Sequence, residues 1–295
     1  MKTDRLIVKL KRVFFRTLIK YSLNPRPVSD PYVTGDGFRA LADHIYDDQS
    51  RNFRPLAVKE KDIVFLGNSR IKEFLNSFHK EIKNRYILVS QNGDENIDDE
   101  AVRLIDDKII RWFGINVIVK HPKVVPLPIG IENKHWYLNG IPSIFDKIRK
   151  KTFVKKNKIF YAFTVGSNKK ERQPALDAMV KCPTGETLKQ WMTFAPYLEL
   201  LATYKFTASP IGSSIEGIRN WDALYIKTIP IVKRTVTTEY FESLDIPIWN
   251  IDEWNELISL TEDDLEKKYD EMMAKADWSK IYMDYWKNEI LKSKS

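Results

Sequence analysis

The chain has 295 residues, of which 43% are hydrophobic, 30% charged and 12% aromatic. This composition excludes disordered and collagen-like proteins, because both contain far less apolar and aromatic material. The length suits two domains of about 100–150 residues each. No apolar stretch approaches the roughly 18 residues that a membrane span needs. The single cysteine, Cys182, cannot form an internal disulfide, so we expect a cytoplasmic protein.

The net charge of +8 is concentrated first in residues 1–24. Residues 1–21 hold seven Lys or Arg and one acid, Asp4, and apolar residues recur among them at helical spacing. The pattern predicts a basic amphipathic helix over residues 1–24. Such a helix either lies on an anionic membrane surface, here the inner face of the membrane, or packs on its own domain.

Residues 25–150 are expected to form an N-terminal domain in which short strands alternate with helices. The expected strands are 63–67, 86–90, 115–119 and 124–129, and the expected helices are 69–78 and 98–108. This alternation predicts a mostly parallel sheet with helices on its faces.

A second basic run, residues 147–158, carries seven Lys or Arg. Aromatic residues are not interleaved there as stacking on bases requires, so the run is interpreted as a solvated linker and no nucleic-acid partner is expected. Residues 151–295 then repeat the alternation as a C-terminal domain. Its expected elements are strands 159–163, 206–209, 228–233 and 246–251, helices 170–180, 197–204 and 217–226, and a final helix from Thr261.

The most informative segment is residues 205–254, which is typical of a strand, a loop of small residues and a helix. In the loop, Gly212 permits a tight turn, Ser213 and Ser214 offer hydroxyls, and free backbone N–H groups at the helix start suit phosphate. Arg219 and Asp222, three residues apart, share one face of the helix. A guanidinium there can bind a diphosphate, and a carboxylate one turn later can bind ribose hydroxyls. The alternative is a surface ion pair beside an ordinary turn.

The order of residues in this segment also carries a family resemblance. The segment contains, in order, Ser209-Pro210, Gly212, Arg219, Trp221-Asp222-Ala223-Leu224 and Ile229-Pro230-Ile231-Val232. This order resembles the donor-binding half of exostosin-like glycosyltransferases. The N-terminal half is similar to bacterial relatives of that group through Asn92-Gly93-Asp94 and His121-Pro122-Lys123.

The resemblance implies a GT-B-like α/β fold, with two Rossmann-like domains facing across a cleft and a C-terminal helix that closes back. The nucleotide-sugar would lie on the C-terminal domain, where Arg219 would neutralise the diphosphate and Asp222 would hold the ribose. Arg172, after the first strand of that domain, is a candidate second phosphate ligand. The chain has no Asp-x-Asp triad, and its histidines have no metal-ligand spacing, so we expect neither a metal nor another cofactor.

Inverting sugar transfer needs a base that takes the proton from the acceptor hydroxyl. Asp94 is the first candidate, because it follows a predicted strand in a glycine-containing loop that faces the expected cleft. Its alternative role is to stabilise the turn. Asp36, in Gly35-Asp36-Gly37, is the second candidate, and Glu132 is the third.

We therefore predict a metal-independent, inverting hexosyltransferase that moves a sugar from a nucleotide-sugar to a cell-surface polysaccharide or a lipid-linked glycan, as in lipopolysaccharide or capsule synthesis. The donor stays open among UDP-hexopyranoses, UDP-hexofuranoses such as UDP-galactofuranose, and other nucleotide-sugars. The alternative function is a non-catalytic nucleotide-sugar-binding or glycan-binding protein of the same fold.

Overall fold

The structure, a computed structural model, describes residues 6–7, 9–10, 13–14, 17, 21, 25–137 and 139–295. The predicted helix over residues 1–24 therefore falls largely outside the described residues. Its described apolar residues are helical and expose between 45% and 62% of their surface: Leu6, Ile7, Leu10, Val13 and Phe14. Within the described part of the chain, no helix combines the length and apolarity that a bilayer crossing requires. Membrane docking through residues 1–21 stays a prediction.

The N-terminal domain is built on a five-stranded parallel sheet whose strands lie side by side in the order of the sequence. The strands are β1 (His44–Tyr46), β2 (Asp62–Gly67), β3 (Tyr86–Gln91), β4 (Ile109–Gly114) and β5 (Val124–Pro126). All neighbouring pairs are parallel. Parallel neighbours need crossover connections, and these are right-handed in nearly all proteins. Here each strand lies on the same side of the strand before it, so right-handed connections place all the connecting helices on a single face of the sheet.

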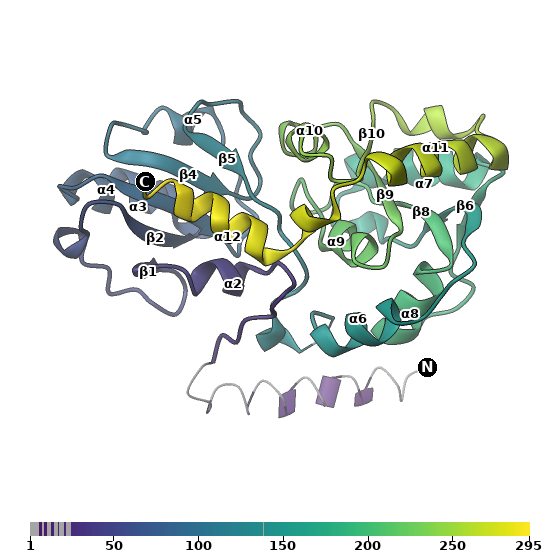
Figure 1. Cartoon of the computed structure of the whole chain (residues 1–295), viewed down its shortest axis with the longest axis horizontal. Coiled ribbons are helices and arrows are strands. Elements are labelled where there is room, and N and C mark those ends of the chain that lie inside the picture. Colours follow the sequence, from purple (N-terminus) through teal and green to yellow (C-terminus); the bar gives the residue numbers. More distant parts are fainter. Residues whose placement is uncertain are drawn as a thin grey trace.

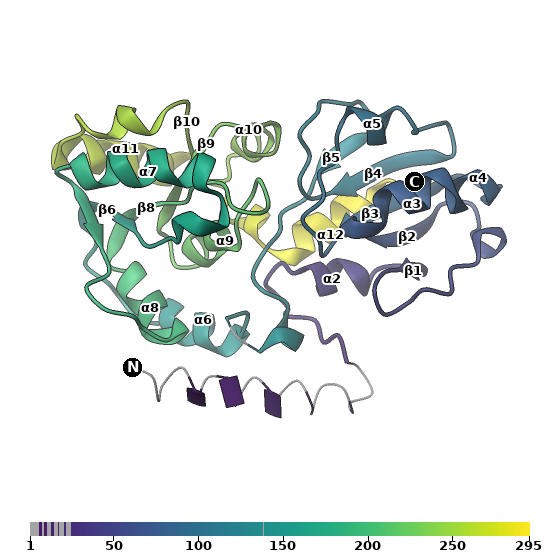
Figure 2. The same cartoon turned by 180° about the vertical axis from the view of Figure 1, so that it is seen from behind.

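The two faces of this sheet are covered by different parts of the chain. The local helices are α2 (Gly35–Arg39), α3 (Ile71–Asn76), α4 (Phe78–Glu81) and α5 (Asp99–Val102). On one face Leu88 of β3 packs with Phe74 of the crossover helix α3. On the other face Val89 belongs to a cluster with Phe38 of α2 and Trp286 of the C-terminal helix. Figure 1 shows the C-terminal helix in front of the sheet, and Figure 2, from behind, shows α3 in front instead.

The C-terminal helix, α12 (Met283–Lys292), returns from the second domain to cover the first. The Met283 N–H donates to the Pro31 carbonyl at 3.0 Å. At the end of the chain, Lys294 Nζ lies 3.0 Å from the Asp43 carboxylate, and Lys61 Nζ donates to the Ser295 carbonyl at 2.8 Å. The expected helix that closes back is confirmed.

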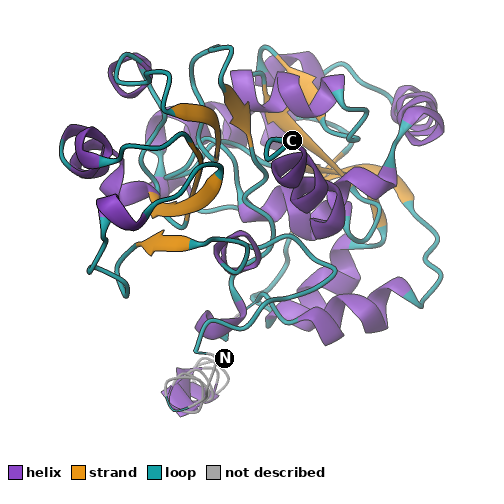
Figure 3. Cartoon of the chain, turned by 60° about the vertical axis from the view of Figure 1, so that its left-hand side comes forward, coloured by secondary structure: helices purple, strands orange, loops and turns teal. Residues whose placement is uncertain are grey.

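The C-terminal domain contains a second five-stranded parallel sheet, in the order β10-β9-β8-β6-β7. Its strands are β6 (Lys156–Tyr161), β7 (Gly185–Thr187), β8 (Tyr204–Ala208), β9 (Ile229–Lys233) and β10 (Trp249–Ile251). Its helices are α6 (Pro142–Arg149), α7 (Lys169–Lys181), α8 (Phe194–Leu201), α9 (Ile218–Leu224), α10 (Val236–Ser243) and α11 (Glu262–Lys275). Because the strand order changes direction at β6, helices cover both faces: Ala178 of α7 packs with Phe206, and Leu198 of α8 shares a core with Phe160. Figure 3 shows the strands of both domains enclosed by helices.

Most expected strands and helices lie within a few residues of their predicted positions, and Thr261 caps α11 as predicted. Three local predictions are wrong. The fourth strand is β4 at 109–114, and residues 115–119 form only an isolated bridge at Val117. The helix expected over 98–108 is the single turn α5. The basic run 147–158 is no linker, because it ends α6 and begins β6. Ile148 is buried, and the Lys155 ammonium donates to the carbonyls of Ala202 and Tyr204 at 2.8 and 3.2 Å.

The two domains share one apolar core. In it the ring of Tyr32 packs edge-on against Tyr225 at 4.7 Å and lies 5.2 Å from Phe145. The buried Tyr225 hydroxyl accepts the Val33 N–H at 3.0 Å and donates to the Ile281 carbonyl at 2.7 Å. One side chain of the second domain thereby joins the segments that precede α2 and α12. The expected α/β fold, with two Rossmann-like domains and a returning helix, is confirmed.

We expect Tyr225→Phe to lower the free energy of unfolding by about 1–3 kcal/mol, because it leaves a buried N–H and a buried carbonyl without a partner. Tyr285→Phe is the matched control, since the Tyr285 hydroxyl hydrogen-bonds no described residue, and its effect should stay within about 0.5 kcal/mol. Urea unfolding of both variants measures the difference. Equal losses in the two variants would contradict the assigned role of the Tyr225 hydroxyl.

Candidate active site

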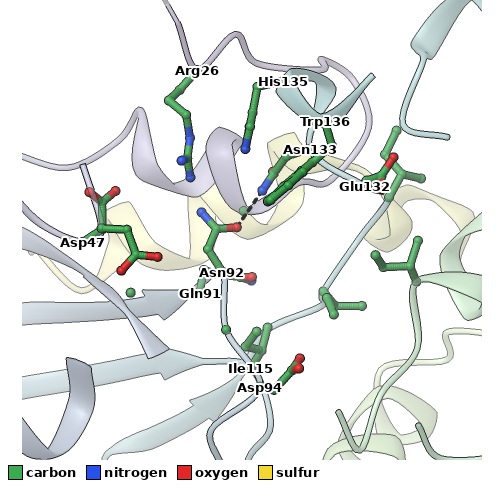
Figure 4. Close-up of a pocket in the computed structure, with 17 residues that line it drawn as sticks. Arg26, Asp47, Gln91, Asn92, Asp94, Ile115, Glu132, Asn133, His135 and Trp136 are labelled. Atoms are coloured by element: carbon green, nitrogen blue, oxygen red, sulfur yellow. Dashed lines mark hydrogen bonds between the residues drawn. The ribbon is translucent and has the colours of Figure 1, made fainter. Parts of the chain in front are cut away.

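The first cavity lies at the carboxyl ends of the strands of the N-terminal sheet and has a volume of about 290 Å³. Gly67 ends β2, Gln91 ends β3, and the loop that follows β5 supplies residues 129–136. Ile218 of α9 lines the cavity from the second domain. Carboxyl ends of parallel strands are the usual place for ligands in such sheets. Figure 4 shows His135 and Trp136 on one side of the cavity and Asp94 on the other.

A buried carboxylate organises one wall of this cavity. The Asp36 side chain has no exposed surface, and Arg26 Nε donates to its Oδ1 at 2.8 Å. His135 Nδ1 lies 2.6 Å from Asp36 Oδ2. Among the described residues, none hydrogen-bonds Nε2 of His135, whose ring lines the cavity. A neutral imidazole that donates from Nδ1 to a carboxylate keeps Nε2 as a proton acceptor, which is the arrangement of a general base.

Side-chain amides hold the loops of this wall together. Asn133 Nδ2 donates to Asn92 Oδ1 at 2.7 Å, as the dashed line in Figure 4 shows. The Asp36 N–H donates to Asn133 Oδ1 at 2.9 Å. Asn92 has a φ of 60°, in the left-handed region that asparagine tolerates better than most residues. Gly130 has a φ of 72°, and a Cβ there would lie 2.0 Å from the Val33 carbonyl oxygen. The approach of this loop to α2 therefore needs glycine.

The second cavity adjoins the first at Ile218 and has a volume of about 660 Å³. It lies beyond the carboxyl end of β6, and its polar wall contains Arg219 and Asp222 of α9. Tyr197 of α8 and Trp191 are among its aromatic residues. Both cavities are lined by Ile218, so they adjoin each other, and together they are called the cleft below.

Asp222 is the most unusual group of the second cavity. Its side chain is nearly buried, and its Oδ1 has no hydrogen-bond partner among the described residues. Burial raises the pKa of Asp222 to about 8; Arg219 opposes that increase and Glu132 of the other domain adds to it. A buried carboxyl oxygen without a partner at a cavity wall is a place for a ligand that donates hydrogen bonds.

Arg172 positions the loop that precedes α9. Its guanidinium donates to the carbonyls of Ile211 and Thr164, at 3.1 and 2.9 Å, and packs so closely on Gly212 that a Cβ there would lie 2.5 Å away. Burial and, second, the nearby charge of Arg219 lower the pKa of Arg172. Two guanidinium groups therefore lie close to each other beside this loop, an arrangement that an anion would stabilise.

The same loop contacts the N-terminal domain at two points. Ser214 Oγ donates to Asp94 Oδ1 at 2.7 Å. The fully buried Glu216 accepts the Ile129 N–H at 3.0 Å and, through its other oxygen, the indole N–H of Trp221. Burial raises the pKa of Glu216 to about 8, and both donors oppose that increase. The loop between β8 and α9 is thus fixed to both walls of the cleft.

The residues predicted from the sequence are distributed over the cleft as follows. Asp94 and Glu132 line the first cavity. Asp36 does not line it, but its carboxylate binds Arg26 and His135, which do. Arg219 and Asp222 line the second cavity. Gly212, Ser213 and Ser214 belong to the adjoining loop, which Arg172 of α7 contacts, and none of these four residues lines either cavity. His135 was not predicted. It lies 99 residues from Asp36, and no motif in the sequence connects them. Within the described residues, no three His, Cys, Asp or Glu are grouped as a metal site requires.

Comparisons with known proteins find similarity to solved structures only. No protein-family model matches the sequence, and no curated protein does. The chain is similar to a structure described as trehalose-6-phosphate from E. coli bound with UDP-2-fluoro glucose (TM-score 0.48, 9% identity, covering 81% of this chain and 74% of that one). It is also similar to an α,α-trehalose-phosphate synthase (UDP-forming) from Burkholderia vietnamiensis, with a TM-score of 0.47 and 7% identity over 80% of this chain and 73% of that one. A third similar structure is the spinosyn rhamnosyltransferase SpnG complexed with thymidine diphosphate, with a TM-score of 0.38 and 8% identity over 99% of this chain and 79% of that one.

We expect Glu216→Gln to flatten the pH dependence of stability. The folded chain keeps the Glu216 proton up to its pKa of about 8, whereas the unfolded chain loses it near 4.5. Because the folded state binds more protons between these values, the free energy of unfolding falls as pH rises through that window, by up to about 1.4 kcal/mol per pH unit for one proton. Denaturant unfolding at pH 5, 6.5 and 8 measures the slope for wild type, Glu216→Gln and the exposed control Glu81→Gln. A variant slope equal to that of wild type would contradict the expectation.

Proposed function

We propose that the chain is a glycosyltransferase that moves a sugar from a nucleotide-sugar in the second cavity to an acceptor hydroxyl in the first. The observation that carries this proposal is that an anion-binding group and a candidate general base line two adjoining cavities. Arg219 and Asp222 line one cavity, and a histidine held by a buried aspartate lines the next. Sugar transfer needs both parts, because a diphosphate must leave while an acceptor loses its proton.

The donor would bind against the C-terminal domain. Arg219, with Arg172 behind the loop of residues 210–214, would neutralise the charge that develops on the departing diphosphate. The unpartnered Oδ1 of Asp222 would accept a hydrogen bond from a ribose hydroxyl. Ser213, Ser214 and Gly212 would shape the loop around the phosphates. These roles follow from the exostosin-like resemblance of the sequence. UDP is the favoured nucleotide of the donor, and UDP-galactofuranose is one candidate sugar donor.

The base would be His135, positioned by Asp36. Its Nε2 would take the proton from the acceptor hydroxyl, and the Asp36 carboxylate would stabilise the imidazolium that forms. The sequence favours Asp94, but that carboxylate accepts a hydrogen bond from Ser214, which suits a role in closing the cleft. A base on the acceptor side, opposite the leaving group, supports an inverting reaction. A surface polysaccharide or lipid-linked glycan stays the predicted acceptor.

We expect a nucleoside diphosphate to raise the unfolding midpoint of the wild type and to raise that of Arg219→Ala by about half as much or less. A ligand at 100 times its dissociation constant stabilises by about 2.7 kcal/mol, which is roughly 5–10 °C here. Loss of a charge-assisted contact should weaken binding by about tenfold or more. Thermal unfolding with UDP, dTDP, GDP and CMP measures the effect, and Arg103→Ala, an exposed arginine of the other domain, is the control. No shift with any nucleotide would overturn the donor site.

We expect His135→Ala to reduce turnover by about 10²–10⁴-fold while nucleotide affinity stays unchanged, because only the proton transfer is lost. Release of nucleoside diphosphate from the donor that binds, with water or sugars as acceptor, measures turnover. His121→Ala is the matched control, since His121 lines a separate cavity beside Val117 and Tyr240.

The same assay separates the candidate bases. A large loss in Asp94→Asn or Glu132→Gln, together with near-wild-type turnover in His135→Ala, would move the base to that carboxylate. Nucleotide binding without turnover in the wild type would favour the non-catalytic alternative.

A further inference from the structure

The polar lining of the first cavity is built from groups that bind hydroxyls. The carboxamides of Gln91, Asn92 and Asn133 line it together with the carboxylates of Asp94 and Glu132. Gln91 is 1% exposed, its amide nitrogen donates to the Pro128 carbonyl at 2.9 Å, and its oxygen hydrogen-bonds no described residue. Amides and carboxylates together both donate to and accept from hydroxyl groups, so a buried acceptor oxygen at this wall favours a polyhydroxylated ligand.

An aromatic side chain stands at the edge of the same cavity. Trp136 lines it, is 39% exposed, and its ring lies 5.2 Å from the ring of His135. Tyr137, the next residue, has a φ of 53°, a left-handed conformation that is costly for a bulky residue. An indole beside a general base gives one apolar surface to a ring whose hydroxyls face the amides. This geometry suits a sugar ring in this cavity.

The charges of the cavity decide which sugars fit. Four carboxylates line it: Asp47, Asp48, Asp94 and Glu132. Arg39 binds Asp47 at 2.6 Å and Arg70 lies 3.7 Å from Asp48, but the four carboxylates still outnumber these two cations. Arg26 is its only lining arginine or lysine among the described residues, and it already binds the buried Asp36 carboxylate at 2.8 Å. A phosphate or carboxylate on the ligand would meet excess negative charge. Arg219 lines the other cavity, where the diphosphate is proposed to bind, and Arg172 contacts the adjoining loop at the Ile211 carbonyl.

We propose that the first cavity is an acceptor subsite for a sugar residue without an anionic group, either neutral or carrying an amine, and that it discriminates against phosphorylated sugars and uronic acids. This inference rests on the proposed function, because it names the acceptor class for the same site. Cations and carboxylates lie in different halves of the cleft, so each half favours a different ligand. The arginines would hold the anionic donor. The carboxylates would repel the donor phosphates and anionic sugars from the acceptor subsite.

The test uses methyl glycosides in matched gluco, galacto and manno series, each as the neutral sugar, the 2-amino sugar, the 6-phosphate and the uronate. Binding to the nucleotide-saturated full chain is measured by ligand-observed NMR titration. In whichever series binds, we expect the neutral and amino members to bind at least about tenfold more tightly than the two anionic members. Equal or tighter binding of an anionic member overturns the proposal, and so does the absence of binding in all series.

A charge-reversal variant tests the cause of the selectivity. Asp48 lines the cavity with a side chain that is 72% exposed, so Asp48→Lys is expected to fold. We expect it to raise affinity for the uronate by about fivefold and to leave nucleotide affinity unchanged. Asp107→Lys, at the amino end of β4 on the opposite edge of the sheet, should change neither affinity. Equal gains in both variants overturn the electrostatic cause. Because nucleotide binding is measured first and separately, its failure identifies an error in the proposed function rather than in the acceptor class.

Discussion

The buried hydroxyl of Tyr225 is the interaction on which the arrangement of the two domains depends. It belongs to the C-terminal domain, yet its partners are the Val33 N–H before α2 and the Ile281 carbonyl before α12. These two helices cover the face of the N-terminal sheet that the crossover helices leave open. A sheet whose parallel strands follow one another in a single direction cannot cover that face with its own connections. The second domain therefore completes the core of the first.

This shared core also determines the width of the cleft. With the domains joined through Tyr32, Tyr225 and Phe145, the loop between β8 and α9 is brought against the N-terminal domain. The contacts from Ser214 to Asp94 and from Glu216 to Ile129 then fix that loop on both sides. An arginine of one domain and a histidine of the other are held in adjoining cavities by packing that lies outside both of them.

The two halves of the cleft differ in charge. Its C-terminal half contains two arginines near a loop of small residues, and its N-terminal half contains carboxylates and amides. Asp36 makes this possible, because one buried carboxylate binds Arg26 and orients His135. In the proposed function, His135 would act as the base on the acceptor side, and Arg219 would neutralise the diphosphate on the donor side.

The sequence by itself determined the alternation of strands and helices, because buried parallel strands and their helices leave local apolar patterns. It also identified the segment with Arg219 and Asp222, whose residues lie within one helix and the loop before it. It misplaced β4 and did not predict the short strands β1 and β7, since three residues carry too little pattern to be recognised.

Only the tertiary structure decided which residues share the cleft. The pairing of Asp36 with His135 joins positions 99 residues apart, through a loop that reaches α2 only because Gly130 adopts a positive φ. The return of α12 to the first domain depends likewise on an uncovered sheet face, which is a property of strand order and not of any single segment. Local patterns report on neighbours along the chain, whereas these contacts arise from packing between distant segments.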